Sequence, residues 1–229
     1  MDLTVLYQDN HLLAVHKPAG LLVQGDRSGD PCLVDVAKAW LKETCGKPGN
    51  VYLGLVHRLD RNVSGVVMLA RTSKAAGRLS AAFRDGTVTK HYLAVVLGTP
   101  PADAGELTAW LAGEGDAQGV TRAAATPFPG AREAVLRYAV RERSGGLSLV
   151  DVEPVTGRRH QIRAQLALVG CPLLGDVKYG APDRLPDRRL ALHAWRLELD
   201  HPVGGAPLTI TAPTDATWPW PAPTGRTGP

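Results

Sequence analysis

Short apolar runs separated by turns rich in Gly and Pro dominate the hydrophobic pattern of this chain. Strand-like runs occupy residues 12–15, 51–56, 66–70, 87–97, 134–140, 147–152 and 190–199, with a last one around 208–210. Apolar side chains at helical spacing predict helices over 33–41 and 73–83, and a third that opens at 156–157. Because strands mostly follow one another, with helices interspersed irregularly, the pattern predicts an α+β fold around a mixed, mostly antiparallel β-sheet.

The first 41 residues allow two finer predictions. The apolar run 12–15 stops at a Lys-Pro-x-Gly turn over 17–20 and resumes at 21–23, which predicts a hairpin-like pair of strands. Asp30 followed by Pro31 has the form of a helix start, an N-cap with proline at the first helical position.

The C-terminal end has a different composition. From Pro213 onward the chain is rich in Pro, Thr and Gly, which predicts a loosely ordered extension. The expected organisation is therefore one domain over residues 1–212 and a tail over 213–229. Residues 98–132, rich in Gly, Ala and Pro, give no clear element.

The first candidate for chemistry is a charged loop over residues 57–65, between two apolar strands that hold it at the rim of the core. Within it, Asp60 lies between Arg58 and Arg61, and positive charge on either side favours the ionised carboxylate. Such a group suits a nucleophile or an electrostatic stabiliser. The alternative is a structural ion pair at the end of a strand.

Two further positions carry candidate side chains. Arg159 and Arg163 are one helical turn apart in the predicted third helix, so they should project together and pair with a carboxylate or grip a phosphate. A solvated helix face is the alternative. Tyr92, on a predicted strand, is either a core side chain or a ring on which a flipped base stacks.

The charge distribution bears on the partner. The net charge is +4, and residues 54–92 contain seven basic and two acidic side chains. This concentration suits a polyanion such as RNA, although a solvated basic helix face would look the same. Three scattered cysteines argue against a disulfide framework and a zinc site, and the histidines lack metal-ligand spacing. Without a signal peptide or a membrane-length apolar run, the sequence predicts a cytoplasmic protein.

Taken together, residues 6–213 resemble the RluA-like family of RNA pseudouridine synthases. Five blocks carry the resemblance in order: residues 6–20; His57-Arg58-Leu59-Asp60 with Ser64-Gly65; Lys90-x-Tyr92-x-Ala94-x-Val96-x-Gly98; Thr156-Gly157-Arg158-x-His160-Gln161-Ile162-Arg163 with Gly175-Asp176 and Tyr179-Gly180; and Leu192-His193-Ala194 with His201-Pro202. Two positions depart from the family pattern, Val63 where threonine is usual and Gln165 where many members have histidine.

The resemblance implies the pseudouridine synthase fold as a stand-alone catalytic domain, without the small N-terminal RNA-binding domain that many relatives carry. It also implies a reaction without metal or cofactor, in which a uridine of ribosomal or transfer RNA is flipped out, its N1–C1′ bond is cleaved, and the base is rejoined through C5. By analogy Asp60 attacks the nucleotide or stabilises the intermediate, Arg163 orients Asp60, and Tyr92 stacks on the base and helps to remove the C5 proton. Substrate binding is expected from Arg58, which fills the gap left by the base, and from His57, Arg61, His160, Gln161 and Leu192. A monomer is expected.

The alternative function is a catalytically silent RNA-binding or RNA-chaperone protein on the same fold, which would not need Asp60. A protein kinase is excluded because the order is Arg-Leu-Asp and no glycine-rich phosphate loop precedes it. A glycoside hydrolase would need a second carboxylate opposite Asp60, and the sequence offers no convincing one.

Overall fold

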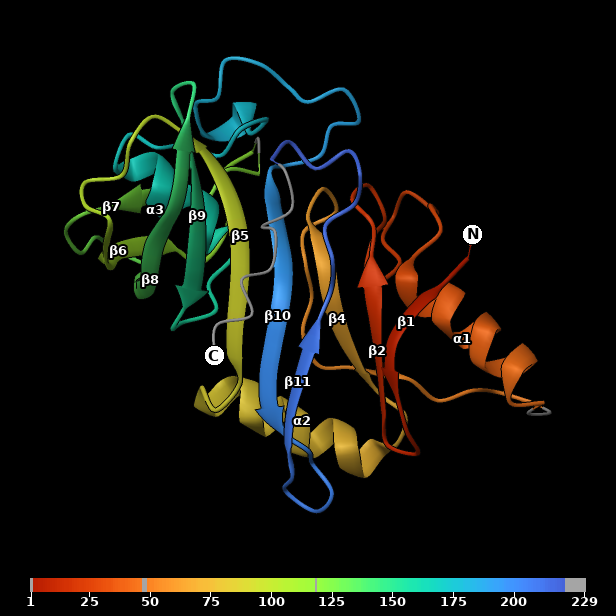
Figure 1. Cartoon of the computed structure of the whole chain (residues 1–229). Helices are drawn as coiled ribbons and strands as arrows, with labels where there is room; N and C mark the ends of the chain where they lie inside the picture. Colours follow the sequence, from red (N-terminus) through yellow and green to blue (C-terminus); the bar gives the residue numbers. More distant parts are fainter. Residues whose placement is uncertain (1, 47–48, 118, 221–229) are drawn as a thin grey trace, which may run out of the picture.

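Within the described residues, eleven strands form one sheet in the order β1-β2-β4-β10-β5-β9-β8-β6-β7, with β3 paired to β4 and β11 paired to β10 (Figure 1). The computed structural model describes residues 2–46, 49–117 and 119–220. The strands are β1 (Thr4–Gln8), β2 (Leu12–Lys17), β3 (Gly54–Leu55), β4 (Ser64–Ala70), β5 (Thr89–Leu97), β6 (Ala104–Ala112), β7 (Ala123–Ala124), β8 (Ala131–Ser144), β9 (Leu147–Pro154), β10 (Leu192–Asp200) and β11 (Pro207–Thr211). Every named strand pair is antiparallel except β4 with β10. The predicted α+β fold with a mixed, mostly antiparallel sheet is therefore confirmed.

The helices of the described residues cover parts of this sheet. They are α1 (Leu33–Thr44), α2 (Ser73–Asp85), α3 (Gln161–Leu168) and the short 3-10 helix η1 (Val177–Tyr179). The Thr72 hydroxyl caps α2 as expected, accepting a hydrogen bond from the Ala75 N–H. The start predicted for α1 is two residues early: its N-cap is Cys32, and Asp30 forms an ion pair with Arg61 instead. None of the described helices is long and apolar enough to cross a membrane.

The predicted hairpin between residues 12–15 and 21–23 is wrong. Strand β2 pairs with β1, while Leu22 forms only an isolated bridge with Cys32. The reason is Lys17, which is fully buried and donates hydrogen bonds from Nζ to the carbonyls of Pro18, Leu21 and Arg61 at 2.8–2.9 Å. A buried ammonium needs such acceptors, so the chain wraps around it instead of running straight back along β2.

The parallel contact between β4 and β10 depends on a glycine and a buried hydrogen bond. Gly65 has φ +124°, and a Cβ on it would lie 2.2 Å from the Ala194 carbonyl oxygen. Next to it, the Ser64 hydroxyl hydrogen-bonds His193 Nδ1 at 2.8 Å. The Ser-Gly pair of the signature therefore joins two central strands.

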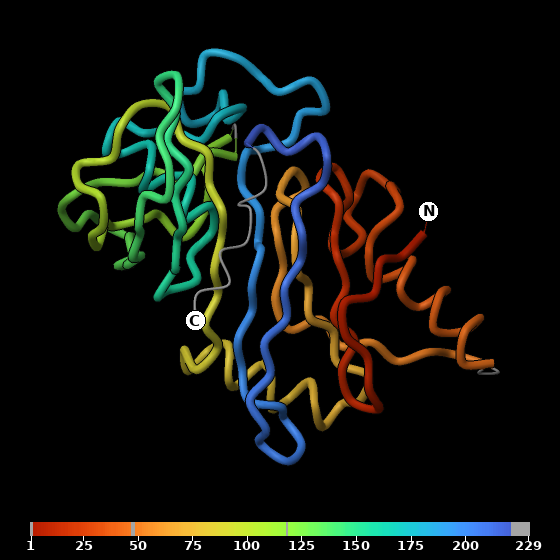
Figure 2. Tube along the Cα trace, in the orientation of Figure 1, coloured from red at the N-terminus to blue at the C-terminus, as the bar shows by residue number. Residues whose placement is uncertain are grey.

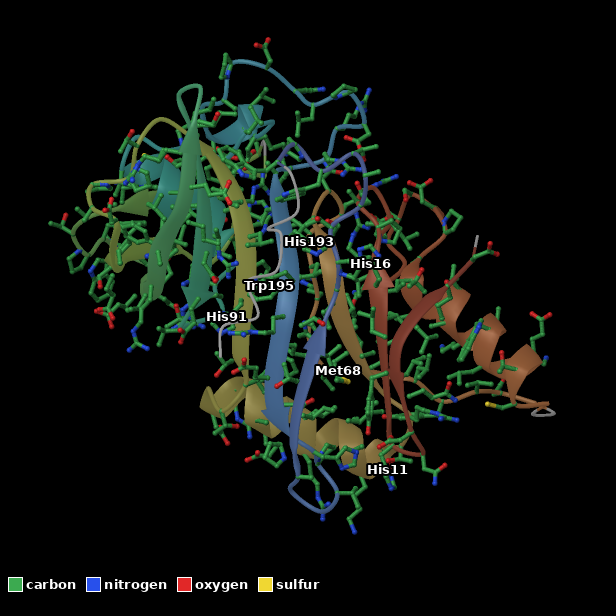
Figure 3. The ribbon with its side chains drawn as sticks, viewed as in Figure 1. His11, His16, Met68, His91, His193 and Trp195 are labelled. Atoms are coloured by element: carbon green, nitrogen blue, oxygen red, sulfur yellow. The ribbon has the colours of Figure 1, made fainter. Side chains whose placement is uncertain are left out.

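Alternation along β10 separates two faces of the sheet. Leu192 packs in the core cluster that contains Leu13, Val67 and Ala94, whereas His193 and Trp195 point the other way. Figure 3 labels His193 and Trp195 on β10, with His16 on β2 lying beside His193. His193 belongs to this second face, and its Nε2 donates to the Ala212 carbonyl.

The segment that follows β11 packs on this second face. Trp218 and Trp220 are buried, the Trp220 indole N–H donates to Glu142, and Asp215 forms an ion pair with Arg189. The expected loose extension is therefore wrong for residues 213–220, because two large aromatic rings bury their apolar surface there. Residues 221–229 lie outside the described residues, and the division into a domain and a tail stays a prediction.

Candidate active site

A cavity of about 470 Å³ opens between the loop that precedes β4 and the loop that precedes α3. Asp60, Tyr92, His160 and Arg163, which are far apart in the sequence, all line it. The remaining lining residues are Val56, His57, Arg58, Leu59, Val63, Ser80, Phe83, Arg84, Lys90, Pro154, Thr156, Gly157, Arg158, Gln161, Ile162 and Leu192. Of the nine residues predicted for the site, all but Arg61 are brought together here.

The loop that holds Asp60 is fixed through its backbone. Arg61 supplies the anchor, because its carbonyl accepts hydrogen bonds from the buried Lys17 ammonium at 2.9 Å and from the Gly20 N–H at 2.8 Å. The Val63 N–H closes the turn on the Asp60 carbonyl at 3.1 Å. Val63 itself is buried in the core, an apolar position that needs no hydroxyl. The carboxylate is thus carried by a rigid turn.

The cation beside Asp60 is Arg163, and the prediction that Arg58 and Arg61 flank the carboxylate in space is wrong. Arg163 donates from Nη1 to Asp60 Oδ2 at 3.0 Å. Arg61 turns away to Asp30 and to the Gly20 carbonyl, and the exposed Arg58 makes no ion pair with any residue that the structure describes. The cation that pairs with Asp60 is thus 103 positions away in the sequence, and neither of the arginines next to it in the loop takes this place.

Arg163 is itself held by a second carboxylate. Its Nε and Nη2 donate to the two oxygens of Asp176 at 2.7 and 2.9 Å, a bidentate pair in which Asp176 is 1% exposed. The guanidinium also lies 4.8 Å from the ring centroid of Tyr179. Burial opposes its charge, but Asp176 and Asp60 together raise the pKa of Arg163 above its ordinary value, so the guanidinium stays charged. One buried arginine thus orients Asp60.

His160 completes the environment of the carboxylate. It has a left-handed backbone, with φ 51°, at the N-cap of α3, and its Nε2 lies 3.5 Å from Asp60 Oδ2. The Thr121 N–H donates to the Tyr179 hydroxyl at 2.7 Å, and that hydroxyl is 2.9 Å from His160 Nδ1. Because the Tyr179 hydroxyl accepts from Thr121, we assign its own proton to the hydrogen bond with His160 Nδ1. The ring proton of His160 is then on Nε2, facing Asp60. Burial lowers the pKa of His160 to about 4, so the ring is neutral at neutral pH.

Tyr92, Leu192 and Ile162 supply apolar surface to the cavity. Burial, and then the charge of Asp60, raise the pKa of Tyr92 far above its ordinary value. Its phenol therefore stays protonated at any physiological pH. A neutral aromatic ring beside aliphatic side chains is a surface on which a planar heterocycle can pack.

His57 and Gln161 line the cavity, and their hydrogen bonds and ring contacts hold its walls together. The His57 ring stacks on Phe83, with centroids 4.6 Å apart, and its Nε2 accepts the Met68 N–H. Gln161 accepts hydrogen bonds from the Thr156 hydroxyl and the Arg158 N–H and donates to the Val135 carbonyl. Both residues hold the walls of the cavity in place.

The predicted start of the third helix is also wrong. Residues 156–160 form a loop stabilised by Gln161, and α3 begins at Gln161. Arg159 is therefore not one helical turn from Arg163: it lies in the loop before α3 and donates to the Gly119 carbonyl at 3.3 Å. Gln165, the other departure from the family pattern, is buried and donates to the carbonyls of Leu107 and Ala134, so it joins α3 to β6 and β8.

The sequence reasoning missed the roles of three residues at this site. Lys17, Asp176 and Tyr179 lie within the recognised blocks, yet nothing in their local pattern shows burial or partners. Asp176 is the second carboxylate of Arg163, Tyr179 fixes His160, and Lys17 anchors the loop of Asp60. One signal could have identified Asp176. It is an acidic residue without an assigned role in the same motif block as Arg163, and a buried arginine needs a carboxylate to balance its charge.

Three histidines, of which His193 is buried and His57 and His160 are half-buried, make the fold sensitive to mild acid. Burial lowers the pKa of His57, His160 and His193 to about 4, whereas a histidine in an unfolded chain titrates near 6.5. The unfolded state therefore binds more protons between these values, so this stability is fully present above about pH 6.5 and is lost as the pH falls towards about 4. At pH 5 the expected loss is about 2 kcal/mol for His193 alone.

Urea unfolding at about pH 7 and about pH 5 measures this loss. A His193→Gln variant, which keeps hydrogen-bonding atoms but cannot titrate, should show a smaller difference between the two conditions. Equal unfolding free energies at both pH values for the unaltered protein would contradict the assignment of neutral buried histidines.

The described residues contain no group of three His, Cys, Asp or Glu side chains placed to hold a metal ion.

Residues 11–168 of the chain match the family described as RNA pseudouridylate synthase.

Two curated relatives and one solved structure illustrate the similarity. The chain is 37% identical to tRNA pseudouridine synthase C of Salmonella typhimurium, covering 94% of this chain and 87% of that one. It is 35% identical to the dual-specificity RNA pseudouridine synthase RluA of Haemophilus influenzae, covering 93% and 94%. Other relatives are longer, and the chain spans 65% of one of them.

Among solved structures, human RNA pseudouridylate synthase domain containing 4 superposes with a TM-score of 0.78 at 28% identity, over 94% of this chain and 90% of that one. This chain therefore belongs to the RNA pseudouridylate synthase family of isomerases and is of the RluA-like type.

Proposed function

We propose that this protein isomerises specific uridines of ribosomal or transfer RNA to pseudouridine, with Asp60 as the catalytic carboxylate. The observation that carries the proposal is the arrangement of Asp60 on the wall of a base-sized cavity, bound to a buried arginine that Asp176 holds from behind. Burying a bidentate ion pair costs desolvation free energy. Such a cost is expected at an active site, where the position of a reacting carboxylate such as that of Asp60 must be fixed.

The cavity offers what a flipped uridine needs. Tyr92 and Leu192 would pack against the faces of the base, and Arg58, Arg84 and Lys90 bring positive charge for the phosphates around it. Extruding a base costs a few kcal/mol, which these contacts must offset. We propose that Arg58, which has no ion-pair partner among the described residues, fills the gap left in the RNA.

The carboxylate is oriented for one of its oxygens to react. Within the described part of the chain, the hydrogen bond from Arg163 and the closest approach of His160 both go to Oδ2, which leaves Oδ1 for the nucleotide. In the proposed reaction Oδ1 attacks the nucleotide or stabilises the intermediate while the N1–C1′ bond breaks. The base then turns, and the C5–C1′ bond forms as any Oδ1–C1′ bond breaks. The C5 proton leaves to solvent and N1 takes up a proton, so the reaction is an isomerisation. Neutral Tyr92 acts as a stacking surface, since its raised pKa keeps the phenol protonated and leaves no phenolate to accept a proton.

The other residues predicted to bind substrate have supporting roles in this proposal. His160 presents a ring proton to Asp60, while His57 and Gln161 fix the walls of the cavity. Arg61 acts through its backbone, which anchors the loop of Asp60. The expectations of a cytoplasmic monomer that needs no cofactor stay predictions.

The experiment is release of tritium from RNA labelled at uridine C5. Unmodified ribosomal and transfer RNA transcripts are incubated with the protein, and tritium in water is counted, with Asp60→Ala beside it. Release by the unaltered protein alone supports the proposal, and mapping the modified position names the substrate. RNA binding without release from either pool would favour the silent RNA-binding protein.

A further inference from the structure

A second cavity, of about 400 Å³, lies on the other side of Asp60. It shares Asp60, His160 and Arg163 with the first cavity, so these three residues form the wall between the two. Its remaining lining residues are Arg61, Asn62, Gly119, Arg159, Gly175, Asp176, Val177, Lys178, Arg184, Arg188 and Leu190. Six cationic side chains therefore face two carboxylates.

The carboxylates of this cavity are already used. Arg163 binds both Asp60 and Asp176. Three of the other cations, Arg159, Arg184 and Arg188, form no ion pair with any carboxylate in the described residues, and the last two are exposed on one loop. No carboxylate of the described residues pairs with these three arginines, which makes the cavity a site for an anion.

The loop that carries Arg184 and Arg188 is held under backbone strain. Among the described residues only two that are not glycine have positive φ, His160 at 51° and Arg188 at 57°, and both line this cavity. A left-handed conformation costs a non-glycine residue of order 1 kcal/mol or more, and such strain is concentrated at functional sites. Glycine would adopt this conformation without that cost, so we infer that the arginine at position 188 serves a role other than stabilising the fold.

Two sets of contacts fix this loop beside Asp60. Arg189, only 9% exposed, forms ion pairs with Asp187 and with Asp215 of the C-terminal segment. The Leu190 N–H donates to the carbonyl of Asn62, two residues after Asp60, at 2.9 Å. In Figures 1 and 2 the loop over residues 180–190 arches above the ends of β4 and β10. The arginines are thus presented on a framework tied to the catalytic turn.

We propose that this second cavity binds the phosphodiester next to the target uridine, through Arg184 and Arg188 with help from Arg159. The inference rests on the proposed function. When the base occupies the first cavity, its sugar lies at Asp60, and the adjoining phosphodiester must leave along a surface that starts there. The second cavity starts at Asp60 and holds arginines suited to bidentate phosphate contacts. Because phosphate contacts carry no sequence information, this site sets affinity and register of the RNA.

The test removes each side chain without disturbing the loop. Arg188→Gly keeps the left-handed backbone accessible, Arg184→Ala shortens an exposed side chain, and Arg188→Lys keeps the charge. Arg143→Ala is the matched control, an exposed arginine that pairs with Asp103 and lines neither cavity. Binding of a fluorescein-labelled oligouridylate of about 12 nucleotides is followed by anisotropy between about 50 and 200 mM KCl.

We expect the Arg184→Ala/Arg188→Gly pair to reduce the slope of log Kd against log salt by about 0.7, the value for loss of one phosphate contact to a single strand. Tritium release should show KM raised about tenfold with kcat nearly unchanged, as for a positioning contact made equally in ground and transition states. Arg188→Lys should restore part of the affinity, and Arg143→Ala should match the unaltered protein.

Slopes and KM values indistinguishable from those of Arg143→Ala would overturn this assignment, whether or not the protein releases tritium. If the unaltered protein releases no tritium but the two arginines still change the salt slope, the RNA-binding cavity stands and the proposed reaction fails. The two proposals therefore fail separately.

Discussion

Arg163→Met is expected to destabilise the protein by about 3–5 kcal/mol and to lower kcat by about 10²-fold or more. The stability loss arises because Asp176, 1% exposed, would keep a buried charge without its bidentate partner. The loss in kcat arises because Asp60 would lose the hydrogen bond that orients it. Urea unfolding measures the first effect, and tritium release under stabilising conditions measures the second.

A second variant separates the structural role of Arg163 from its role at Asp60. In Arg163→Met/Asp176→Leu both members of the buried pair are apolar, and such replacements often recover stability. We expect much of the unfolding free energy to return while kcat stays low. Recovery of both quantities would mean that Arg163 serves folding alone, and an unchanged stability in the single variant would contradict the buried pair itself.

Gly65→Ala is expected to cost about 4 kcal/mol or more, a large fraction of the stability of a typical domain. The added Cβ would lie 2.2 Å from a backbone oxygen of Ala194, where no flexible side chain can move aside, and φ +124° is unfavourable for alanine. Separation of β4 from β10 would also strain the bond between Ser64 and His193. Urea unfolding of soluble material, together with the soluble yield, measures the effect.

Gly77→Ala is the matched control for this substitution. Gly77 lies in α2 without a positive φ, and nothing comes within 4 Å of a Cβ placed on it. Alanine is favoured over glycine inside a helix by about 0.5–1 kcal/mol, so this variant should be slightly more stable than the unaltered protein. If Gly65→Ala behaved like Gly77→Ala, the close contact between β4 and β10 would be wrong.

The sequence pattern predicts the fold class and most long strands because their apolar residues are local signals. It fails where a buried polar group decides the path of the chain. Lys17 draws residues 18–21 around its ammonium, and this removes the hairpin that the apolar runs alone favour. The Trp218 and Trp220 rings likewise dock on a face of the sheet that only the tertiary structure creates.

At the site, too, local sequence motifs are predictive and tertiary contacts are not. The motif blocks identify Asp60 and Arg163, and the structure brings them into contact. Local charge, however, predicts the wrong cations beside Asp60, since Arg61 turns to Asp30 on the far side of the turn. Asp176 escapes prediction because its function depends on a bidentate contact across 13 residues and on nearly complete burial. Neither property has a local sequence signal.

The account depends most directly on Asp60, and Asp60→Asn tests it with the smallest change of shape. Tritium release from the RNA that serves as substrate and binding of the same RNA are measured on one preparation of the variant. We expect release to fall by about 10⁴-fold or more, as when a reacting group is removed, while the affinity for RNA changes by less than about twofold. Release within about tenfold of the unaltered protein, with binding intact, would contradict the assignment of Asp60 as the catalytic carboxylate.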